Sequence, residues 1–322
     1  GEHRLAEQFD RQSGVRTERT PLHLGQWGAF GFRGITQYWR LAAGVRDLIR
    51  KHACRELHVA RCLPEGFVAW ILRAVYRIPY IVYVHGEETR TSATSRELAW
   101  MTRRAYGGAK YLIANSHNTA SILQEEWGVS PSRIRVLHPG VDALRFVPAA
   151  ASERVRRGLG WHGRSIVLTV GRLQIRKGHD MLIRALPRIR QRVPDVLYAV
   201  AGDGEERGRL EALVEELGVK NYVQFLGELT DDQLIECYQQ CDVFALPNRE
   251  VSGDFEGFGM VLVEAQACGK PVVAGDSGGT AETMAVGKTG LTGDCDSPAF
   301  LEETLTALLL DATRRMSMGN SG

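Results

Sequence analysis

The chain is organised around the stretch FEGFGMVLVEAQACG, residues 255–269. Its glycines predict a turn that leads into a short buried helix, with Glu256 at the turn and Glu264 inside the apolar run. A carboxylate in such a run is costly to bury unless it meets a partner. If residues 257–259 open the helix, their backbone N–H groups converge on one spot, which suits an anionic or hydroxyl-rich ligand. A capping glutamate followed by a half-buried, salt-bridged glutamate explains the same pattern, so the stretch alone leaves both interpretations open.

Length and composition place limits on the class of protein. With 322 residues the chain exceeds one ordinary core, and we expect two domains of about 150 residues each. Contents of 44% hydrophobic and 24% charged residues are typical of a soluble globular protein. No apolar run approaches the roughly 18 residues of a spanning helix, and the start of the chain does not resemble a signal peptide. The six cysteines lack metal-ligand spacing, so we expect reduced thiols in a cytoplasmic protein.

Charge is distributed unevenly between the two halves. Residues 1–150 carry 21 Lys/Arg against 13 Asp/Glu, whereas residues 151–322 carry 19 against 25. A basic first half can attract an anionic acceptor or an anionic membrane surface, although a basic surface without a function is equally compatible. The aromatics Trp27, Phe30, Phe32, Tyr38 and Trp39 favour the membrane interpretation, at the inner membrane face. We expect no nucleic-acid partner, because no basic run is interleaved with aromatics at the spacing of a known module.

Short apolar strands alternate with amphipathic helices along almost the whole chain, which predicts an α/β fold with parallel sheets covered on both faces. The alternation lapses in a small-residue connector near residues 146–152 and then restarts. We therefore predict two doubly wound, Rossmann-like domains, residues 1–148 and 149–322. Predicted strands cover residues 56–60, 80–84, 111–114, 133–137, 165–170, 196–201, 222–226, 243–246 and 272–274. Ligands of such sheets bind beyond the carboxyl ends of the strands, and the space between the domains is the expected site.

The junctions between strands and helices in the second half hold groups suited to a phosphate. Arg172 follows the first strand of this half, and Lys177 opens the next helix. Arginine offers a planar fork and lysine a point charge, a common pair for a diphosphate, although each alone is more often a solvated surface cation. Gly204 ends the next strand and allows close backbone approach, and a plain turn would explain it equally well.

These motifs together resemble a known family. GRLQIRKG (171–178), AGDG (201–204), VQFLG (223–227), the Glu256-x7-Glu264 stretch and SGGTAE (277–282) follow one another as in the nucleotide-sugar half of a retaining glycosyltransferase. The resemblance is to family 4 of the GT-B fold (glycosyl transferases group 1), of the phosphatidylinositol-mannosyltransferase type. It covers about residues 165–295. VHGE (84–87), ANS (114–116) and HPGVD (138–142) are similar to the family's acceptor half.

The resemblance implies a role for each matching residue. Arg172 and Lys177 would hold the donor diphosphate and stabilise the charge that grows on it. Glu264 would bind the ribose hydroxyls, and Glu256 would hold hydroxyls of the transferred sugar, with His85 beside that sugar. The remaining substrate-binding positions would be the backbone of Gly257, Phe258, Gly259 and Met260 for the sugar, Phe225 and Leu226 for the base, and Gly204.

The implied reaction is transfer of a hexose from a GDP- or UDP-linked sugar to an acceptor hydroxyl of a glycan or lipid-linked molecule, with retention at the anomeric carbon. The resemblance implies no cofactor and no metal, because the two cations neutralise the diphosphate. Two alternatives stay open: a nucleotide-sugar epimerase of the same fold, and a non-catalytic sugar-nucleotide-binding subunit. The second is favoured because the family's first strand and glycine-rich loop are not found, the glycines at 25, 28, 31 and 34 having no strand before them. The N-terminal domain therefore looks incomplete. We expect the last helix to span residues 298–310, so that the chain stops short of the helix that normally crosses back onto the first domain.

Overall fold

A computed structural model describes residues 10, 14, 16–19, 28–86, 89, 92 and 95–322. The chain divides into two compact units, residues 1–55 and 56–322. The first unit carries the long helix α2 (Phe32–Lys51). The end of α2 contacts residues 16–19, because Glu18 accepts a hydrogen bond from Lys51 and lies beside the His52 ring, each at 2.7 Å. Of the residues singled out above, Gly25, Trp27 and Glu87 lie outside the described part of the chain.

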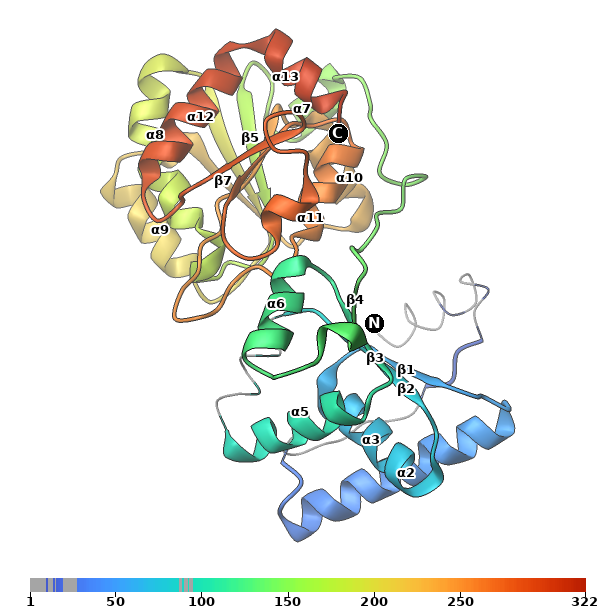
Figure 1. Cartoon of the computed structure of the whole chain (residues 1–322). Helices are drawn as coiled ribbons and strands as arrows, with labels where there is room; N and C mark the ends of the chain where they lie inside the picture. Colours follow the sequence, from blue (N-terminus) through green and yellow to red (C-terminus); the bar gives the residue numbers. More distant parts are fainter. Residues whose placement is uncertain are drawn as a thin grey trace. The chain divides into compact units, whose positions relative to one another are not determined.

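The first sheet belongs to the second unit and is parallel throughout, with the order β1-β2-β3-β4 (Figure 1). Its strands are β1 (Leu57–Val59), β2 (Tyr80–Val84), β3 (Tyr111–Ala114) and β4 (Ile134–Val136), joined by α3 (Phe67–Tyr76), α5 (Arg96–Gly108) and α6 (His117–Glu125). Serine hydroxyls accept hydrogen bonds from the first turns of α5 and α6. These caps satisfy N–H groups that have no partner within a helix, and so define where α5 and α6 begin.

The second sheet has six parallel strands in the order β10-β9-β8-β5-β6-β7. They are β5 (Ser165–Val170), β6 (Val196–Ala201), β7 (Val223–Gly227), β8 (Val243–Leu246), β9 (Val272–Gly275) and β10 (Gly290–Gly293). In chain order this is the 3-2-1-4-5-6 arrangement of a doubly wound dinucleotide-binding sheet. Its direction of growth reverses between β5 and β8, so this pair marks the topological switch point.

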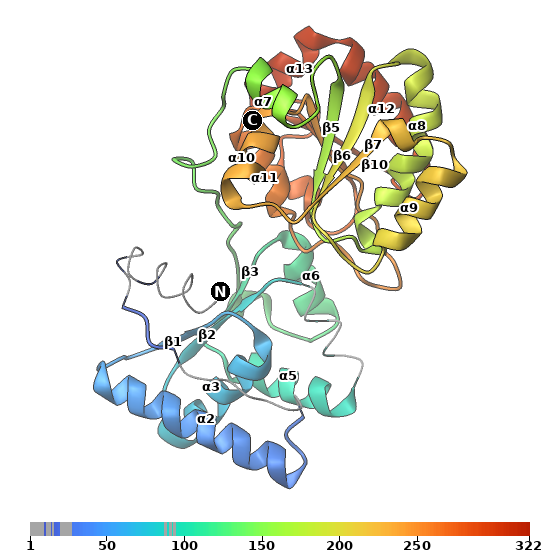
Figure 2. The same cartoon turned by 180° about the vertical axis from the view of Figure 1, so that it is seen from behind.

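Helices cover both faces of the second sheet. They are α7 (Glu153–Gly158), α8 (His179–Arg192), α9 (Arg207–Glu216), α10 (Asp231–Gln240), α11 (Met260–Ala267), α12 (Pro298–Leu310) and α13 (Ala312–Gly319). Figures 1 and 2 show α8, α9 and α12 on one face and α10 with α11 on the other.

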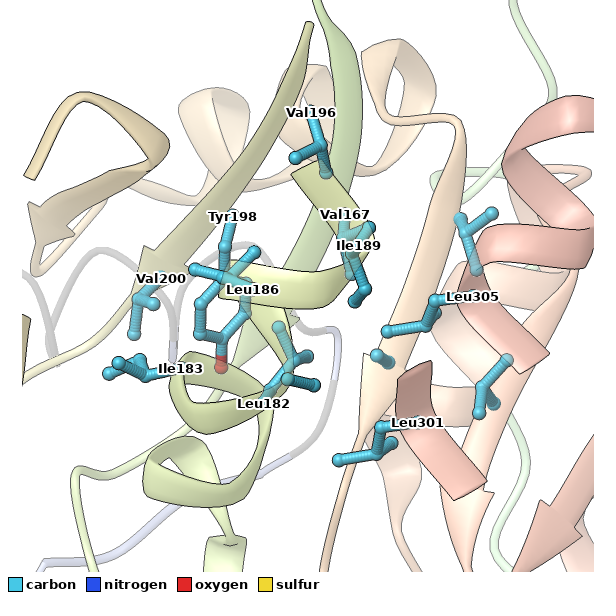
Figure 3. Packing of buried hydrophobic residues seen from close by; sticks show 14 of the residues in the cluster. Val167, Leu182, Ile183, Leu186, Ile189, Val196, Tyr198, Val200, Leu301 and Leu305 are labelled. Atoms are coloured by element: carbon cyan, nitrogen blue, oxygen red, sulfur yellow. The ribbon is translucent and has the colours of Figure 1, made fainter. Parts of the chain in front are cut away.

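Alternation along the strands explains the two layers. Val196, Tyr198 and Val200 of β6 point to the face that packs against α8 and α12, together with Val167 of β5 (Figure 3). Their neighbours Leu197 and Ala199 belong to a separate buried cluster with α10 and α11. Because successive side chains of a strand point to opposite faces, a strand covered on both sides is apolar at every position. The run VLYAVA is buried throughout for this reason.

The two-domain α/β architecture with parallel sheets is confirmed, and most predicted strands match within one or two residues. Three expectations were wrong in detail. α11 begins at Met260 rather than at 257, because Gly259 takes a left-handed φ of 94° that ends the preceding turn. β10 was missed, since its sequence GLTG has low strand propensity. A further helix, α13, follows the helix that we expected to be the last, and the side chain of Asp311 caps it. The boundary predicted between residues 148 and 149 stays a prediction.

Among the described helices, none is long and apolar enough to cross a membrane.

Candidate active site

Two loops meet at the switch point of the second sheet. One links β5 to α8 and carries residues 171–178, and the other links β8 to α11 and carries residues 247–259. The loops approach so closely that a Cβ on Gly178 would lie 1.7 Å from the carbonyl oxygen of Pro247. Gly178 also has a φ of 71°, a left-handed conformation that favours glycine. The fold therefore brings together two segments that lie about 80 residues apart in the sequence.

Glu256 is the acidic centre of this junction. Its side-chain oxygen Oε2 accepts hydrogen bonds from Lys177 Nζ and from Arg176 Nη1, the latter at 2.9 Å. Only 8% of Glu256 is exposed, so its charge needs this compensation. The structure thus brings two of the predicted site residues, Glu256 and Lys177, into direct contact, and it adds Arg176.

Arg172 is placed differently from Lys177. It lies on the same loop but is exposed, and its guanidinium makes no hydrogen bond or ion pair with the described residues. Its backbone carbonyl is 3.4 Å from the buried ring of His179. An exposed guanidinium beside a sheet's switch point is available to an anionic ligand, and its role as a phosphate ligand stays a prediction.

Gly204 lies directly under the same loop. A Cβ at this position would be 2.6 Å from the carbonyl oxygen of Leu173, and the backbone of Asp203 accepts a hydrogen bond from the Leu173 amide at 3.0 Å. The glycine therefore permits the close packing of the loop that carries Lys177. Its predicted substrate contact is neither required nor excluded by this packing role.

Glu264 lies on α11, in the second turn of this helix. Its oxygen Oε2 accepts a hydrogen bond of 2.7 Å from the hydroxyl of Tyr238 on α10. Tyr238 is fully buried, and burial together with the nearby Glu264 charge raises its pKa well above the ordinary value, so it remains a donor. This bond fixes the direction of the carboxylate predicted to hold the ribose. Tyr238 was not identified from the sequence.

His85 and Gly257 meet at the carboxyl end of β2. A Cβ on Gly257 would lie 2.1 Å from the carbonyl oxygen of His85, which also accepts a hydrogen bond from Asn115 at 2.9 Å. The His85 ring is exposed, and its Nε2 lies 3.0 Å from the backbone oxygen of Ala60. The backbone of His85 therefore lies against the loop that carries Glu256, its ring lies beside Ala60, and the contact of the ring with a sugar stays a prediction.

Phe258 and Gly259 complete this loop, and Met260 begins the helix. Phe258 is buried and stacks on the His138 ring, with centroids 5.5 Å apart and planes at 17°. This stack joins the end of the loop to the His138 ring, and the substrate contacts predicted for the backbone of residues 257–260 stay predictions. Phe225 and Leu226 lie on the edge strand β7, where Arg207 covers the Phe225 ring at 4.4 Å.

Glu282 joins the two sheets' loops beside His138. Its two carboxylate oxygens accept hydrogen bonds from the backbone N–H groups of His117 and Asn118, at 2.7 and 3.0 Å, at the start of α6. His138 Nε2 lies 2.9 Å from the same carboxylate. Ligand atoms of His117, His138 and Glu282 lie within 4.8 Å of one another, but the carboxylate already serves the α6 amides. It is a cap for the helix, and its anionic charge suits the positive N-terminal end.

A buried polar network supports the β5–α8 loop from below. The His179 ring lies 2.9 Å from the Tyr198 hydroxyl, which donates to Thr169 at 3.1 Å. The neighbouring Asp180 forms a bidentate ion pair with Arg249, at 2.9 and 3.0 Å. Arg249 lies in the loop after β8, so this pair is a second link between the two loops that form the site.

The fold and the site together define a class of protein. Two Rossmann-like domains with parallel sheets, with basic and acidic loops meeting at a switch point, form the GT-B glycosyltransferase architecture. The "Glycosyl transferases group 1" family model matches residues 152–322, and the "Glycosyltransferase Family 4" model matches residues 4–145. The chain belongs to the glycosyl transferases group 1 family and is a glycosyltransferase.

Relatives of known name share about a third of the sequence. A GDP-mannose-dependent alpha-(1-6)-phosphatidylinositol monomannoside mannosyltransferase of Mycolicibacterium smegmatis is 34% identical over 98% of this chain and 81% of its own length. A D-inositol 3-phosphate glycosyltransferase of Corynebacterium jeikeium is also 34% identical, over 79% of this chain and 64% of its own. Among solved structures, Anabaena Alr3699/HepE in complex with UDP is 26% identical with a TM-score of 0.75, covering 88% of this chain and 76% of that one.

Proposed function

We propose that this glycosyltransferase moves a hexose from a nucleoside-diphosphate sugar to an acceptor hydroxyl with retention of anomeric configuration. The observation that carries the proposal is the pairing of Lys177 with Glu256 at the switch point of the second sheet. A cation for the diphosphate and a carboxylate for sugar hydroxyls stand side by side there, as the two ends of a nucleotide sugar require.

In the proposed reaction, Lys177 and Arg172 stabilise the negative charge that develops on the departing diphosphate. The bond from the anomeric carbon to the phosphate oxygen breaks, and the acceptor oxygen attacks from the same face. The acceptor proton passes to the departing phosphate. Glu256 orients the sugar through its hydroxyls, with His85 beside it, and Glu264 holds the ribose. These cations take the place of a metal ion, and we expect EDTA to leave the turnover unchanged.

GDP-mannose is the first donor to test, since the Mycolicibacterium smegmatis relative is named as GDP-mannose-dependent, and UDP-glucose is the second, since HepE has also been solved in complex with it. The acceptor class that the relatives' names support is an inositol-containing molecule, free or lipid-linked. A thermal-shift screen of GDP, UDP and ADP with their sugars identifies the base. Proton NMR of the first product molecules then reports the configuration at the anomeric carbon.

Substitution of the paired residues tests the site itself. Glu256→Ala and Lys177→Ala should each abolish transfer, while Arg184→Gln, an exposed cation on α8, should leave it unchanged. Unchanged turnover in Glu256→Ala contradicts the proposed site. Product that forms without any acceptor would favour the epimerase, and binding without turnover would favour the non-catalytic subunit.

A peripheral membrane partner has a separate structural basis in α2. Phe32, Ile35 and Trp39 are exposed and follow helical spacing, with Arg33 and Arg40 beside them, whereas Tyr38 is buried and takes no part. Exposed aromatics flanked by arginines suit an anionic lipid surface. Sedimentation with anionic vesicles, compared with neutral ones, tests this; a Phe32→Ser/Trp39→Ser variant that sediments equally well contradicts it.

A further inference from the structure

The side chain of Arg176, next to the predicted phosphate ligand Lys177, faces the loop that carries Glu256 and not the solvent. It lies in the short 3-10 turn before α8 and is only 6% exposed. Its Nη1 is 2.9 Å from Glu256 Oε2, and its Nε is 3.2 Å from Asp254 Oδ2. Its carbonyl oxygen accepts a hydrogen bond from the Arg249 amide at 2.8 Å. Arg176 is thus held at three points by the 249–256 segment.

Arg176 and Lys177 share one carboxylate oxygen. Both donate to Oε2 of Glu256, so the carboxylate has two counter-charges when no donor is bound. A diphosphate carries more negative charge than one carboxylate and attracts the lysine, whose ammonium sits on a flexible stem. The arginine cannot follow, because its planar guanidinium is also bound to Asp254. When Lys177 turns to the phosphate, Arg176 remains as the cation paired with the buried Glu256.

We propose that Arg176 is a positioning residue for Glu256: it holds the carboxylate aimed at the transferred sugar while Lys177 serves the diphosphate. This inference rests on the proposed function of the site. It divides two adjacent cations into two tasks, with Lys177 acting on the donor's phosphates and Arg176 acting only through Glu256. A buried carboxylate that loses its counter-charge takes up a proton or turns away, and in either state it holds sugar hydroxyls poorly.

The test compares Arg176→Gln, Arg176→Lys and the exposed control Arg184→Gln. We expect Arg176→Gln to lower kcat about 10- to 100-fold, the factor for losing one hydrogen bond to a charged group. Affinity for the nucleoside diphosphate without its sugar, measured by calorimetry, should stay unchanged, because Lys177 is intact. Arg176→Lys should recover part of the loss in kcat, because a lysine keeps a cation beside Glu256.

A second variant keeps the inference testable if Arg176→Gln does not fold. Asp254 is 55% exposed at its side chain, so Asp254→Asn should fold and should lower kcat by a smaller factor in the same direction. Wild-type kcat in Arg176→Gln, or a nucleoside-diphosphate affinity that falls as much as kcat, overturns the inference. The two failures are distinguishable. If Glu256→Ala still transfers sugar, the proposed function of the site fails. If Glu256→Ala is inactive but Arg176→Gln keeps the wild-type kcat, only the role of Arg176 fails.

Discussion

The buried His179 makes the free energy of unfolding depend on pH in a defined window. The ring is 1% exposed at the first residue of α8, and burial lowers its pKa from 6.5 to about 4. The folded protein therefore keeps this imidazole neutral at pH 5, while the unfolded chain protonates it. We predict that the free energy of unfolding falls as the pH is lowered from 6.5 to 4.

The size of this effect follows from the pKa difference. Each pKa unit corresponds to about 1.4 kcal/mol, so the shift of His179 removes about 3 kcal/mol of stability between pH 6.5 and pH 4. The sign is that of a group with a depressed folded-state pKa, which binds more protons when unfolded. Asp180 next to it acts in a different range: although burial works against it, Arg249 holds the pKa of Asp180 below 3.8, so its contribution is lost only below that pH.

Urea unfolding, followed by circular dichroism between pH 7 and pH 4, measures the effect in wild type and in His179→Asn. At pH 7 the variant should be less stable, because the bond to Tyr198 is lost, by about 1 kcal/mol. This deficit should shrink and reverse by pH 4, with a total change of about 3 kcal/mol. Leu182→Ala, a core change without a titrating group, should lower stability by about 2–5 kcal/mol at every pH. Parallel curves for His179→Asn and wild type would refute the reasoning.

Three further predictions concern contacts of the site. Tyr238→Phe removes the donor to Glu264 and should reduce the preference for a ribonucleoside diphosphate over its 2′-deoxy form, measured by calorimetry; an unchanged ratio speaks against a ribose role for Glu264. Glu282→Gln should lower the melting temperature at pH 7. Although burial works against it, hydrogen bonds from the α6 amides hold the pKa of Glu282 below 4.5, so the difference from wild type should vanish below the folded-state pKa of Glu282; a difference that persists at low pH contradicts this. Gly257→Ala places a Cβ against a backbone oxygen and should cost about 1–3 kcal/mol in urea unfolding, whereas Gly107→Ala in α5, with open space, should stabilise slightly; equal effects would refute the clash.

Local sequence determined most of the elements of this protein. Short continuous apolar runs and helical spacing depend only on near neighbours, so strands such as Ser165–Val170 and Val196–Ala201 could be predicted to the residue. The sheet-forming alternation also predicted the fold class, because parallel strands joined by helices have few stable arrangements. The spacing of Glu256 and Glu264, with the cations at 172 and 177, predicted a site by resemblance, and the structure brings Lys177 and Glu256 of that set into contact.

The elements that the sequence did not reveal have weak local signals. β10 has the sequence GLTG, which has low strand propensity. Its strand conformation depends on pairing with β9 (Val272–Gly275), which precedes it in the chain and is not part of the local sequence pattern. The start of α11 depends on the left-handed conformation of Gly259. The sequence Gly257-Phe258-Gly259 does not specify which of these residues precedes the first helical residue. In both cases tertiary context outweighed propensity.

Only the tertiary structure decided which charges meet. Lys177 and Glu256 are 79 residues apart, and their contact requires β8 to lie beside β5 across the switch point, an order that no local pattern encodes. The sequence likewise presented Arg172 and Arg176 as two similar cations on one loop. The structure exposes the first and buries the second against Asp254 and Glu256, because Arg176 lies in the 3-10 turn before α8, which packs against the 249–256 segment. Residue types are local properties, whereas partners are set by the packing of segments far apart in the chain.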